Sequence, residues 1–393
     1  MIAKKALVVV LALVLLTLVI AGPIPVPPSI GRGDFRAYWS AAYLLANSQN
    51  FADPDLLLAA EQAHTAWQQD FAVITWNPPW LLALLLPYAV APFIRATWLW
   101  LLTNIVLIFT GSVWVWLAST RGTDAQRLAW VAPLIAFVYS PALITLLMGQ
   151  VSSLVFFGLA AFLYLEARNS RWPAGASLAL PLVKPHLVYI TLPIILLRAA
   201  FKRQWSLLLG LATTLLGLTL LVFLLRPAFL ADYARTVGGG SLLNWETPTL
   251  GGILAATWGW QGIKLMGIVL LPLAVALWWR GRQAISTRTL VDVTLLLSVI
   301  TAPFGWGYDA VVLLIPLLQI IVWLVEGRFG RIESVGLVTA LLLINAISFY
   351  QRSITINELY YFWLPLAIAA IYLYARQRVK EGVGEFASLR VCE

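Results

Sequence analysis

Twelve apolar runs divide this chain, and they constrain its fold more than any other feature. A helix that crosses a lipid bilayer needs about 20 mostly apolar residues, because the hydrocarbon core is about 30 Å thick. Hydrophobic residues make up 61% of the 393 residues and charged residues only 11%, which excludes an ordinary soluble domain. The runs cover residues 6–21, 97–118, 128–145, 151–167, 172–183, 186–198, 205–225, 262–279, 290–302, 309–325, 332–349 and 359–375. They predict an all-α integral membrane protein with about twelve transmembrane helices.

The basic residues indicate how these helices are oriented. A further apolar run, residues 78–93, contains prolines at positions 78, 79, 87 and 92, and whether it crosses the membrane sets the orientation of every later helix. Lys and Arg accumulate in cytoplasmic loops. If 78–93 does not cross, most of the 26 Lys and Arg residues fall on the cytoplasmic side. We therefore predict that 78–93 is an interfacial or re-entrant helix and that both termini are cytoplasmic.

This orientation gives the chain one long extracytoplasmic loop, close to its start. We expect a single transmembrane domain over residues 1–393, in which 23–96 form the first extracytoplasmic loop and 377–393 a cytoplasmic tail. No small-x-small cleavage pattern follows the first apolar run, so we interpret that run as an uncleaved helix rather than a signal peptide. The polar motifs all fall on the extracytoplasmic side of the cell membrane, and we expect the active site there.

The charge and the cysteine content argue against a nucleic-acid partner and against sites built from cysteine. The net charge of +9 records orientation in a membrane protein, so it predicts no nucleic-acid partner. The single cysteine, Cys392, lies in the predicted tail, so the chain has neither an intrachain disulfide nor a cysteine-based metal site.

The first extracytoplasmic loop opens with a carboxylate at the start of a predicted helix. After Asp34, the residues Phe35, Tyr38 and Trp39 recur at helical spacing, while Arg36 lies on another side. This pattern predicts a short amphipathic helix in the membrane interface. Asp34 is then either a plain N-cap or a functional base. The two roles are compatible, because a helix N-terminus stabilises an ionised carboxylate.

A second helix is predicted from about Pro54 to Gln69, and its start shows what a simple cap looks like. Asp53 precedes Pro54 at the first helical position, and Asp55 follows. Proline is favoured at that position and Asp at the cap. Asp53-Pro54-Asp55 matches the bare Asp-x-Asp pattern of metal-dependent nucleotide-sugar enzymes, but we interpret it as this cap. We expect no metal ion and no cofactor.

Several motifs in order along the chain resemble those of a known enzyme family. They are Asp34-Phe35-x-x-Tyr38, then Asn77-Pro78-Pro79, then Ser140-Pro141…Gly149-Gln150, then Lys184-Pro185. In this order and on one side of the membrane they resemble glycosyltransferase family 87, membrane enzymes of the GT-C fold that use polyprenyl-phosphate mannose.

The resemblance implies a reaction and a role for Asp34. It implies transfer of a sugar, mannose in the first instance, from a polyprenyl-phosphate donor to a lipid or glycan acceptor at the extracytoplasmic face. The donor is a substrate and not a cofactor, and the surrounding membrane lipids are the other partners. Asp34 matches the family's early catalytic carboxylate, whose expected role is general base on the acceptor hydroxyl in a single inverting displacement.

Other polar residues are candidates for binding the substrates. Lys184 lies between two apolar runs, where an ionisable group is costly and tends to have a purpose, although a snorkelling lysine fits equally. Arg226 is a second candidate for the donor phosphate, and His186 either hydrogen-bonds substrate or is a solvated loop histidine. Candidates for the sugar and its acceptor are Arg36, Tyr38, Gln150, Trp306 and Tyr308.

One segment departs from the family pattern. Relatives often carry a histidine near the aromatic residue of Trp306-Gly307-Tyr308, whereas this chain has Asp309. An acid there would repel a donor phosphate, so Asp309 is a candidate for binding the acceptor or a cation.

Two other functions remain alternatives from the sequence alone. A transporter or flippase for a lipid-linked or small polar substrate would also have about twelve spans and intramembrane polar groups. The long first loop and the absence of two similar halves favour an enzyme over it. A polymerase or ligase of lipid-linked glycans would usually carry its large loop late in the chain, whereas here the largest loop comes first.

Overall fold

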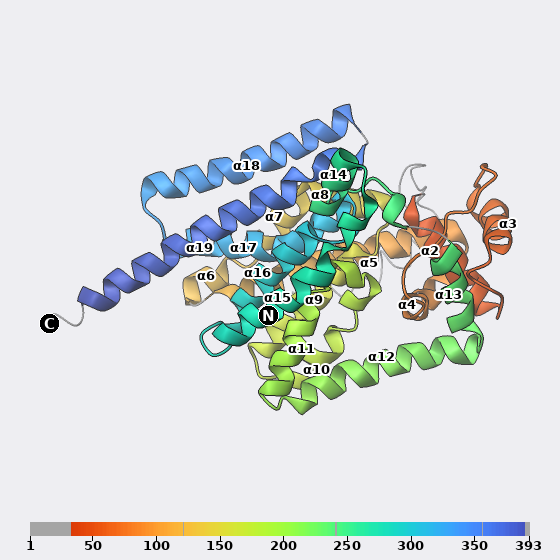
Figure 1. Ribbon diagram of the computed structural model, residues 1–393, viewed down its shortest axis with the longest axis horizontal. Coiled ribbons are helices and arrows are strands. Elements are labelled where there is room, and N and C mark those ends of the chain that lie inside the picture. Colours follow the sequence, from red (N-terminus) through yellow and green to blue (C-terminus); the bar gives the residue numbers. More distant parts are fainter. Residues whose placement is uncertain (1–32, 121, 240–241, 356, 390–393) are drawn as a thin grey trace, which may run out of the picture. The chain divides into compact units, whose positions relative to one another are not determined.

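The computed structural model of the protein describes residues 33–120, 122–239, 242–355 and 357–389. Every regular element in these ranges is a helix (Figure 1), so the predicted all-α class is confirmed. The first predicted span, 6–21, lies outside the described residues. The described chain divides into two compact units, each presented by itself below.

Unit 1 contains the described residues within Met1–Val106, Thr145–Val151 and Leu215–Gly240. Its complete helices are α2 (Asp34–Ala46), α3 (Pro54–Thr65), α4 (Trp80–Ala89) and α13 (Phe229–Gly239), and it shares α5 (Phe93–Ser119), α8 (Ser140–Met148) and α12 (Trp205–Leu225) with unit 2. Helix α2 packs against both α3 and α4. Its Phe35 ring stacks on Trp100 of α5 with the centroids 5.6 Å apart.

Unit 2 contains the described residues within Leu107–Ile144, Ser152–Thr214 and Ser241–Glu393. Its helices are α6 (Thr123–Arg127), α7 (Val131–Val138), α9 (Ser152–Glu166), α10 (Arg171–Ser177), α11 (Thr191–Phe201), α14 (Leu250–Trp258), α15 (Gly267–Gly281), α16 (Thr287–Ile300), α17 (Leu314–Val325), α18 (Arg331–Ile354) and α19 (Trp363–Leu389). Short 3₁₀ segments are η1 (Pro181–Val183), η2 (Pro185–Leu187), η3 (Leu242–Asn244), η4 (Gln261–Met266), η5 (Gly307–Leu313) and η6 (Glu358–Tyr361). Helices α18 and α19 pack together (Figure 1).

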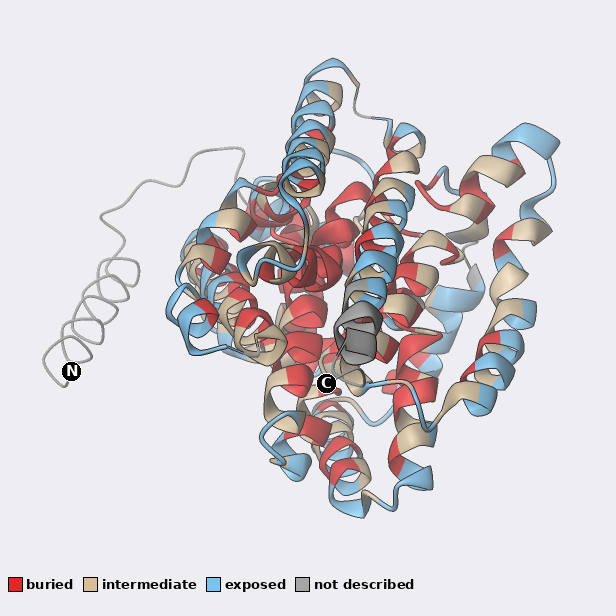
Figure 2. Ribbon diagram, turned by 90° about the vertical axis from the view of Figure 1, so that its left-hand side faces the viewer, coloured by how far each residue is buried: buried red, intermediate tan, exposed pale blue. Residues whose placement is uncertain are grey.

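Six helical segments of the described chain are long and apolar enough to cross a membrane. They are Phe93–Ser119, Trp205–Leu225, Gln261–Gly281, Gly307–Val325, Arg331–Ile354 and Glu358–Glu381. Figure 2 shows some helices buried along most of their length and others exposed along much of theirs. On α18 the exposed side chains include Ile332, Leu342 and Ile347, which suits a helix that faces lipid. The total of twelve spans stays a prediction.

Proline explains why several apolar runs are not continuous helices. The run 128–145 is split into α7 and α8, which meet at 71°, where Tyr139 is extended and Pro141 follows with no N–H for the helix ladder. The runs 172–183 and 186–198 are interrupted by η1 and η2, each of which has a proline at its start.

The first loop forms the predicted helices, with differences in burial and length. Ten residues of α2 are buried, including Arg36 and Ser40, so part of its predicted polar side is covered, and its location in the membrane interface stays a prediction. Helix α3 ends at Thr65 rather than Gln69, because Ala66 adopts a left-handed φ of 55°. Helix α4 has only ten residues, about 15 Å, and is too short to cross a bilayer.

Candidate functional site

The start of α2 carries a hydrogen-bonded chain of three side chains. Asp34 is the first residue of the helix, and the N-cap residue is Gly33, which makes no side-chain cap bond. The Gln150 Nε2 donates to the Asp34 Oδ2, and the Tyr38 hydroxyl donates to the Gln150 Oε1 over 3.0 Å. Because the Tyr38 donor occupies the amide oxygen, the amide nitrogen is directed to Asp34. A donor on a carboxylate favours its ionised form.

The turn after α8 fixes the position of Gln150. Gly149 has a φ of 67°, a left-handed conformation that glycine adopts without a steric cost. The Gln150 N–H donates back to the Thr145 carbonyl over 2.9 Å, and the Trp100 indole donates to the Gly149 carbonyl over 2.7 Å. Gln150 is 1% exposed, so its orientation is held by backbone and indole contacts together.

Arg36 anchors α2 to the end of α3. Its Nε donates to the Thr65 Oγ1 over 2.8 Å, and the Thr65 hydroxyl in turn donates to the Glu61 carbonyl over 2.6 Å. The guanidinium lies 4.4 Å from the centroid of the Trp67 ring. Arg36 is 5% exposed. The structure thus places Arg36 inside the loop, and its predicted role in binding substrate stays a prediction.

In unit 2 a buried ion pair joins two residues that the sequence singled out separately. The Lys184 Nζ lies 2.7 Å from the Asp309 Oδ1, and both side chains are almost fully buried. The Ser152 hydroxyl donates to the same oxygen over 2.6 Å, and the Trp306 N–H donates to the Asp309 Oδ2 over 3.0 Å. Such a pair is stable because each charge is compensated and hydrogen-bonded. Asp309 is therefore a partner of Lys184.

Aromatic rings surround this ion pair. The Lys184 Nζ lies 4.7 Å from the centroid of Tyr308 and 5.9 Å from that of Trp306, whose rings stack at 6.0 Å. His186 packs against Phe304 with the ring centroids 4.3 Å apart, and its Nε2 has no hydrogen-bond partner among the described residues. His186 is thus a packed residue rather than a solvated loop histidine.

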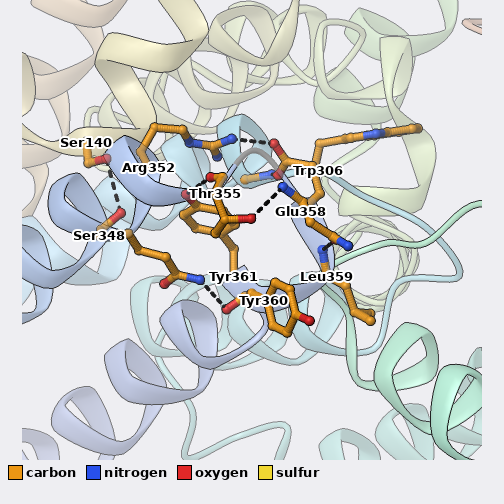
Figure 3. A network of polar contacts seen from close by, with 12 residues as sticks. Ser140, Trp306, Ser348, Arg352, Thr355, Glu358, Leu359, Tyr360 and Tyr361 are labelled. Carbon is orange, nitrogen blue, oxygen red and sulfur yellow. Dashed lines mark hydrogen bonds and ion pairs between the residues drawn. The ribbon is translucent and has the colours of Figure 1, made fainter.

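Arg352 and Glu358 form a clasp (Figure 3). It holds the backbone of residue 307, just before Tyr308 and Asp309. The Arg352 Nη1 lies 2.6 Å from the Glu358 Oε1, and the Glu358 Oε2 accepts the Gly307 N–H over 2.7 Å. A Cβ at position 307 would lie only 2.6 Å from the Arg352 Nη2. A side chain there would displace the Arg352 guanidinium and the Glu358 carboxylate, and the bond to Glu358 fixes the backbone one residue before Tyr308.

Arg226 is paired within unit 1. Its Nε lies 2.7 Å from the Asp232 Oδ2, and the Asp232 side chain is 2% exposed while that of Arg226 is 29% exposed. Arg235 lies 3.8 Å from the other carboxylate oxygen. A partly exposed guanidinium with a buried partner keeps some of its surface open, so its role as a phosphate ligand stays a prediction.

Sequence reasoning missed Glu61 and Glu358. Glu61 is fully buried, and a helical spacing of four from Leu57 to Glu61 to Thr65 would have placed it on the buried face of α3. Glu358 follows a helix break and contacts the backbone of residue 307, and no local pattern indicates a contact at that distance along the chain.

A small cavity and a large cavity lie in unit 2. A cavity of about 20 Å³ adjoins Trp306, Asp309 and Tyr361, which is room for about one water molecule. An apolar cavity of about 490 Å³ lies between α7, α17 and α18. Among the residues that the structure describes, no three His, Cys, Asp or Glu side chains are grouped so as to hold a metal ion.

Comparison with known proteins gives one match. The model of Glycosyltransferase family 87 matches residues 75–306, which is more than half of the chain. The matched segment includes Asn77-Pro78-Pro79, Gln150, Lys184 and Trp306, and it begins after Asp34. No curated protein and no solved structure matches the chain.

Proposed function

The chain belongs to glycosyltransferase family 87 and is a membrane glycosyltransferase; we propose that its donor is a polyprenyl-phosphate sugar, mannose in the first instance. The acceptor is a lipid or glycan, and the reaction takes place at the extracytoplasmic face. Asp34 is the general base. Membership of an enzyme family favours this function over a transporter or flippase.

One observation carries the proposal: the chain of hydrogen bonds from Tyr38 through Gln150 to Asp34. It joins the first-loop motif to the Gly149-Gln150 motif around a carboxylate at a helix start. A general base must be ionised and held in a fixed direction. The N–H that Gln150 donates favours the ionised form of the Asp34 carboxylate. Gln150 is itself buried and held by its hydrogen bond from Tyr38, so it holds that carboxylate in a fixed direction.

The reaction follows from these groups as a single displacement. The acceptor hydroxyl oxygen attacks the anomeric carbon of the sugar while its proton passes to the Asp34 carboxylate. The bond between the anomeric carbon and the phosphate oxygen breaks, and polyprenyl phosphate leaves with the electron pair. One displacement at one carbon inverts its configuration. Because a carboxylate is a modest base for a hydroxyl, much of the rate gain comes from positioning.

Unit 2, taken by itself, contains groups that suit a polyprenyl-phosphate donor. Lys184 is a buried cation suited to the charge on the leaving phosphate, and the partly exposed Trp306 ring suits a sugar face, whereas Tyr308 is buried behind it. In the structure Lys184 is bonded to Asp309. Binding of the donor then requires Lys184 to share its charge between Asp309 and the phosphate.

The apolar cavity of unit 2 suits the polyprenyl chain. Its lining includes Ile135, Leu317 and Leu342, so it offers hydrocarbon contacts along three helices. Tyr139, which also lines it, donates its hydroxyl to the Ala310 carbonyl over 3.2 Å. Tyr139 thus connects the lining of this cavity to the residue that follows Asp309.

A substitution at Gln150 tests the hydrogen-bonded chain. We expect Gln150→Ala to lower kcat for sugar transfer about 10²-fold, because Asp34 loses the donor that orients it. The KM for the donor is expected to change little. Steady-state transfer from polyprenyl-phosphate mannose measures both, and Gln68→Ala, at an exposed position, is the matched control. A Gln150→Ala variant with wild-type kcat would remove the basis of the proposal.

A further inference from the structure

Glu61 is the one fully buried carboxylate of the described first loop. Both of its carboxylate oxygens accept the N–H of Val73, over 3.2 and 3.1 Å. It lies on α3, one helical turn before Thr65, the residue that binds Arg36. Its carboxylate therefore bonds the loop that follows α3, and its own helix carries Thr65, which binds Arg36 of α2.

Two connections link Glu61 to the start of α2. The first is the attraction between its carboxylate and the Arg36 guanidinium. The second is the hydrogen-bonded path from Arg36 through the Thr65 hydroxyl to the Glu61 carbonyl. Arg36 is two residues after Asp34 in the same helix. A contact that holds Arg36 therefore also holds the first turn of α2, which contains Asp34.

We propose that Glu61 is a positioning residue for sugar transfer, which in its ionised form holds Arg36 at the start of α2 and Val73 in the loop after α3. This inference rests on the proposed function, since its consequence is the placement of Asp34. Glu61 itself does not touch the reacting atoms. It acts through Arg36.

The protonation state of Glu61 is poised near neutral pH. Burial raises the pKa of its carboxyl from 4.5 to about 7, while the bond from Val73 and the charge of Arg36 lower it by less. Arg36 is the charged group that α2 presents to it. The loop presents the Val73 backbone, and its own acid, Asp70, is exposed. Above pH 7 Glu61 is mainly ionised and holds Arg36; below pH 7 it is mainly neutral and the attraction is lost.

The pH profile of transfer tests this role. In the wild type we expect kcat to fall about tenfold as the pH drops from 8 to 6, with an inflection near 7, because a misplaced base is a poor one. The donor is a phosphate diester, which does not titrate in this range. We expect Glu61→Gln to show the low-pH rate at every pH, with the inflection gone. Asp55→Asn, which removes an exposed acid from the same helix, is expected to keep the wild-type profile.

Hydrogen–deuterium exchange provides a readout that does not depend on activity. After correction for the intrinsic exchange rate, we expect the segments 34–46 and 66–76 of the wild type to become more protected between pH 6 and 8. In Glu61→Gln we expect no such change. Retention of the wild-type inflection by Glu61→Gln, or the same pH-dependent protection in both proteins, would overturn the proposal. If exchange behaves as expected but the wild type transfers no sugar, the proposed function fails while the placement of Glu61 stands.

Discussion

Asp34→Asn is expected to lower kcat for sugar transfer by about 10²–10⁴-fold, the usual contribution of a general base. Asn has nearly the same size, and the N-cap of α2 is Gly33 rather than this residue, so the fold of α2 should be kept. What the variant loses is the acceptor for the proton of the attacking hydroxyl. Steady-state transfer with matched protein levels measures the effect, and the KM for the donor is expected to change little.

A matched control exists one helix further along the chain. Asp53 caps α3 by accepting the N–H groups of Asp55 and Leu56. Asp53→Asn is the same substitution at the start of another helix, there at the N-cap itself, and we expect it to leave transfer near the wild-type rate. Equal losses in the two variants would mean that Asp34 only stabilises its helix, and equal retention would mean that the base is another residue.

Lys184→Met is expected to cost both stability and activity. It leaves Asp309 buried without the cation that lies 2.7 Å away, and breaking a buried ion pair in this way destabilises a protein by about 3–5 kcal/mol. The same substitution removes the proposed ligand of the donor phosphate. Unfolding in detergent measures the first effect and transfer measures the second. Lys202→Met, at an exposed lysine of unit 2, is the control for both.

A double variant separates the two effects. Lys184→Met with Asp309→Asn removes both charges, so we expect most of the lost stability to return. We expect transfer to stay low, because the cation for the phosphate is still missing. Recovery of transfer together with stability would show that Lys184 serves only as the partner of Asp309.

The sequence predicted the elements whose signals are local. The helical class follows from the apolar runs, and the cap at Asp53 follows from an Asp before a proline; the structure confirms both. The helical spacing of Phe35, Tyr38 and Trp39 predicted that Asp34 is the first or the capping residue of a helix, and it is the first residue of α2. Membership of family 87 is also confirmed, because the motifs in their order carry that information.

The features that the sequence did not predict depend on packing between distant segments. From the sequence, Asp309 was expected to repel the donor phosphate. In the fold it binds Lys184 and Ser152, which are more than 100 positions away along the chain. Arg36 was predicted to lie on the polar side of α2, but it is buried and binds Thr65 of α3. From hydropathy alone the run 128–145 was predicted to be one helix. The structure bends it just before Pro141, and hydropathy carries no information about such a bend.

The most direct test of the proposed function is a transfer assay with purified protein in liposomes. The liposomes hold a lipid acceptor fraction and labelled polyprenyl-phosphate mannose, and a parallel set holds labelled nucleotide mannose. We expect label to move only from the polyprenyl-phosphate donor, without added metal, into a product with inverted configuration at the anomeric carbon. Transfer from the nucleotide sugar alone, or movement of the lipid donor across the bilayer with no product formed, would contradict it.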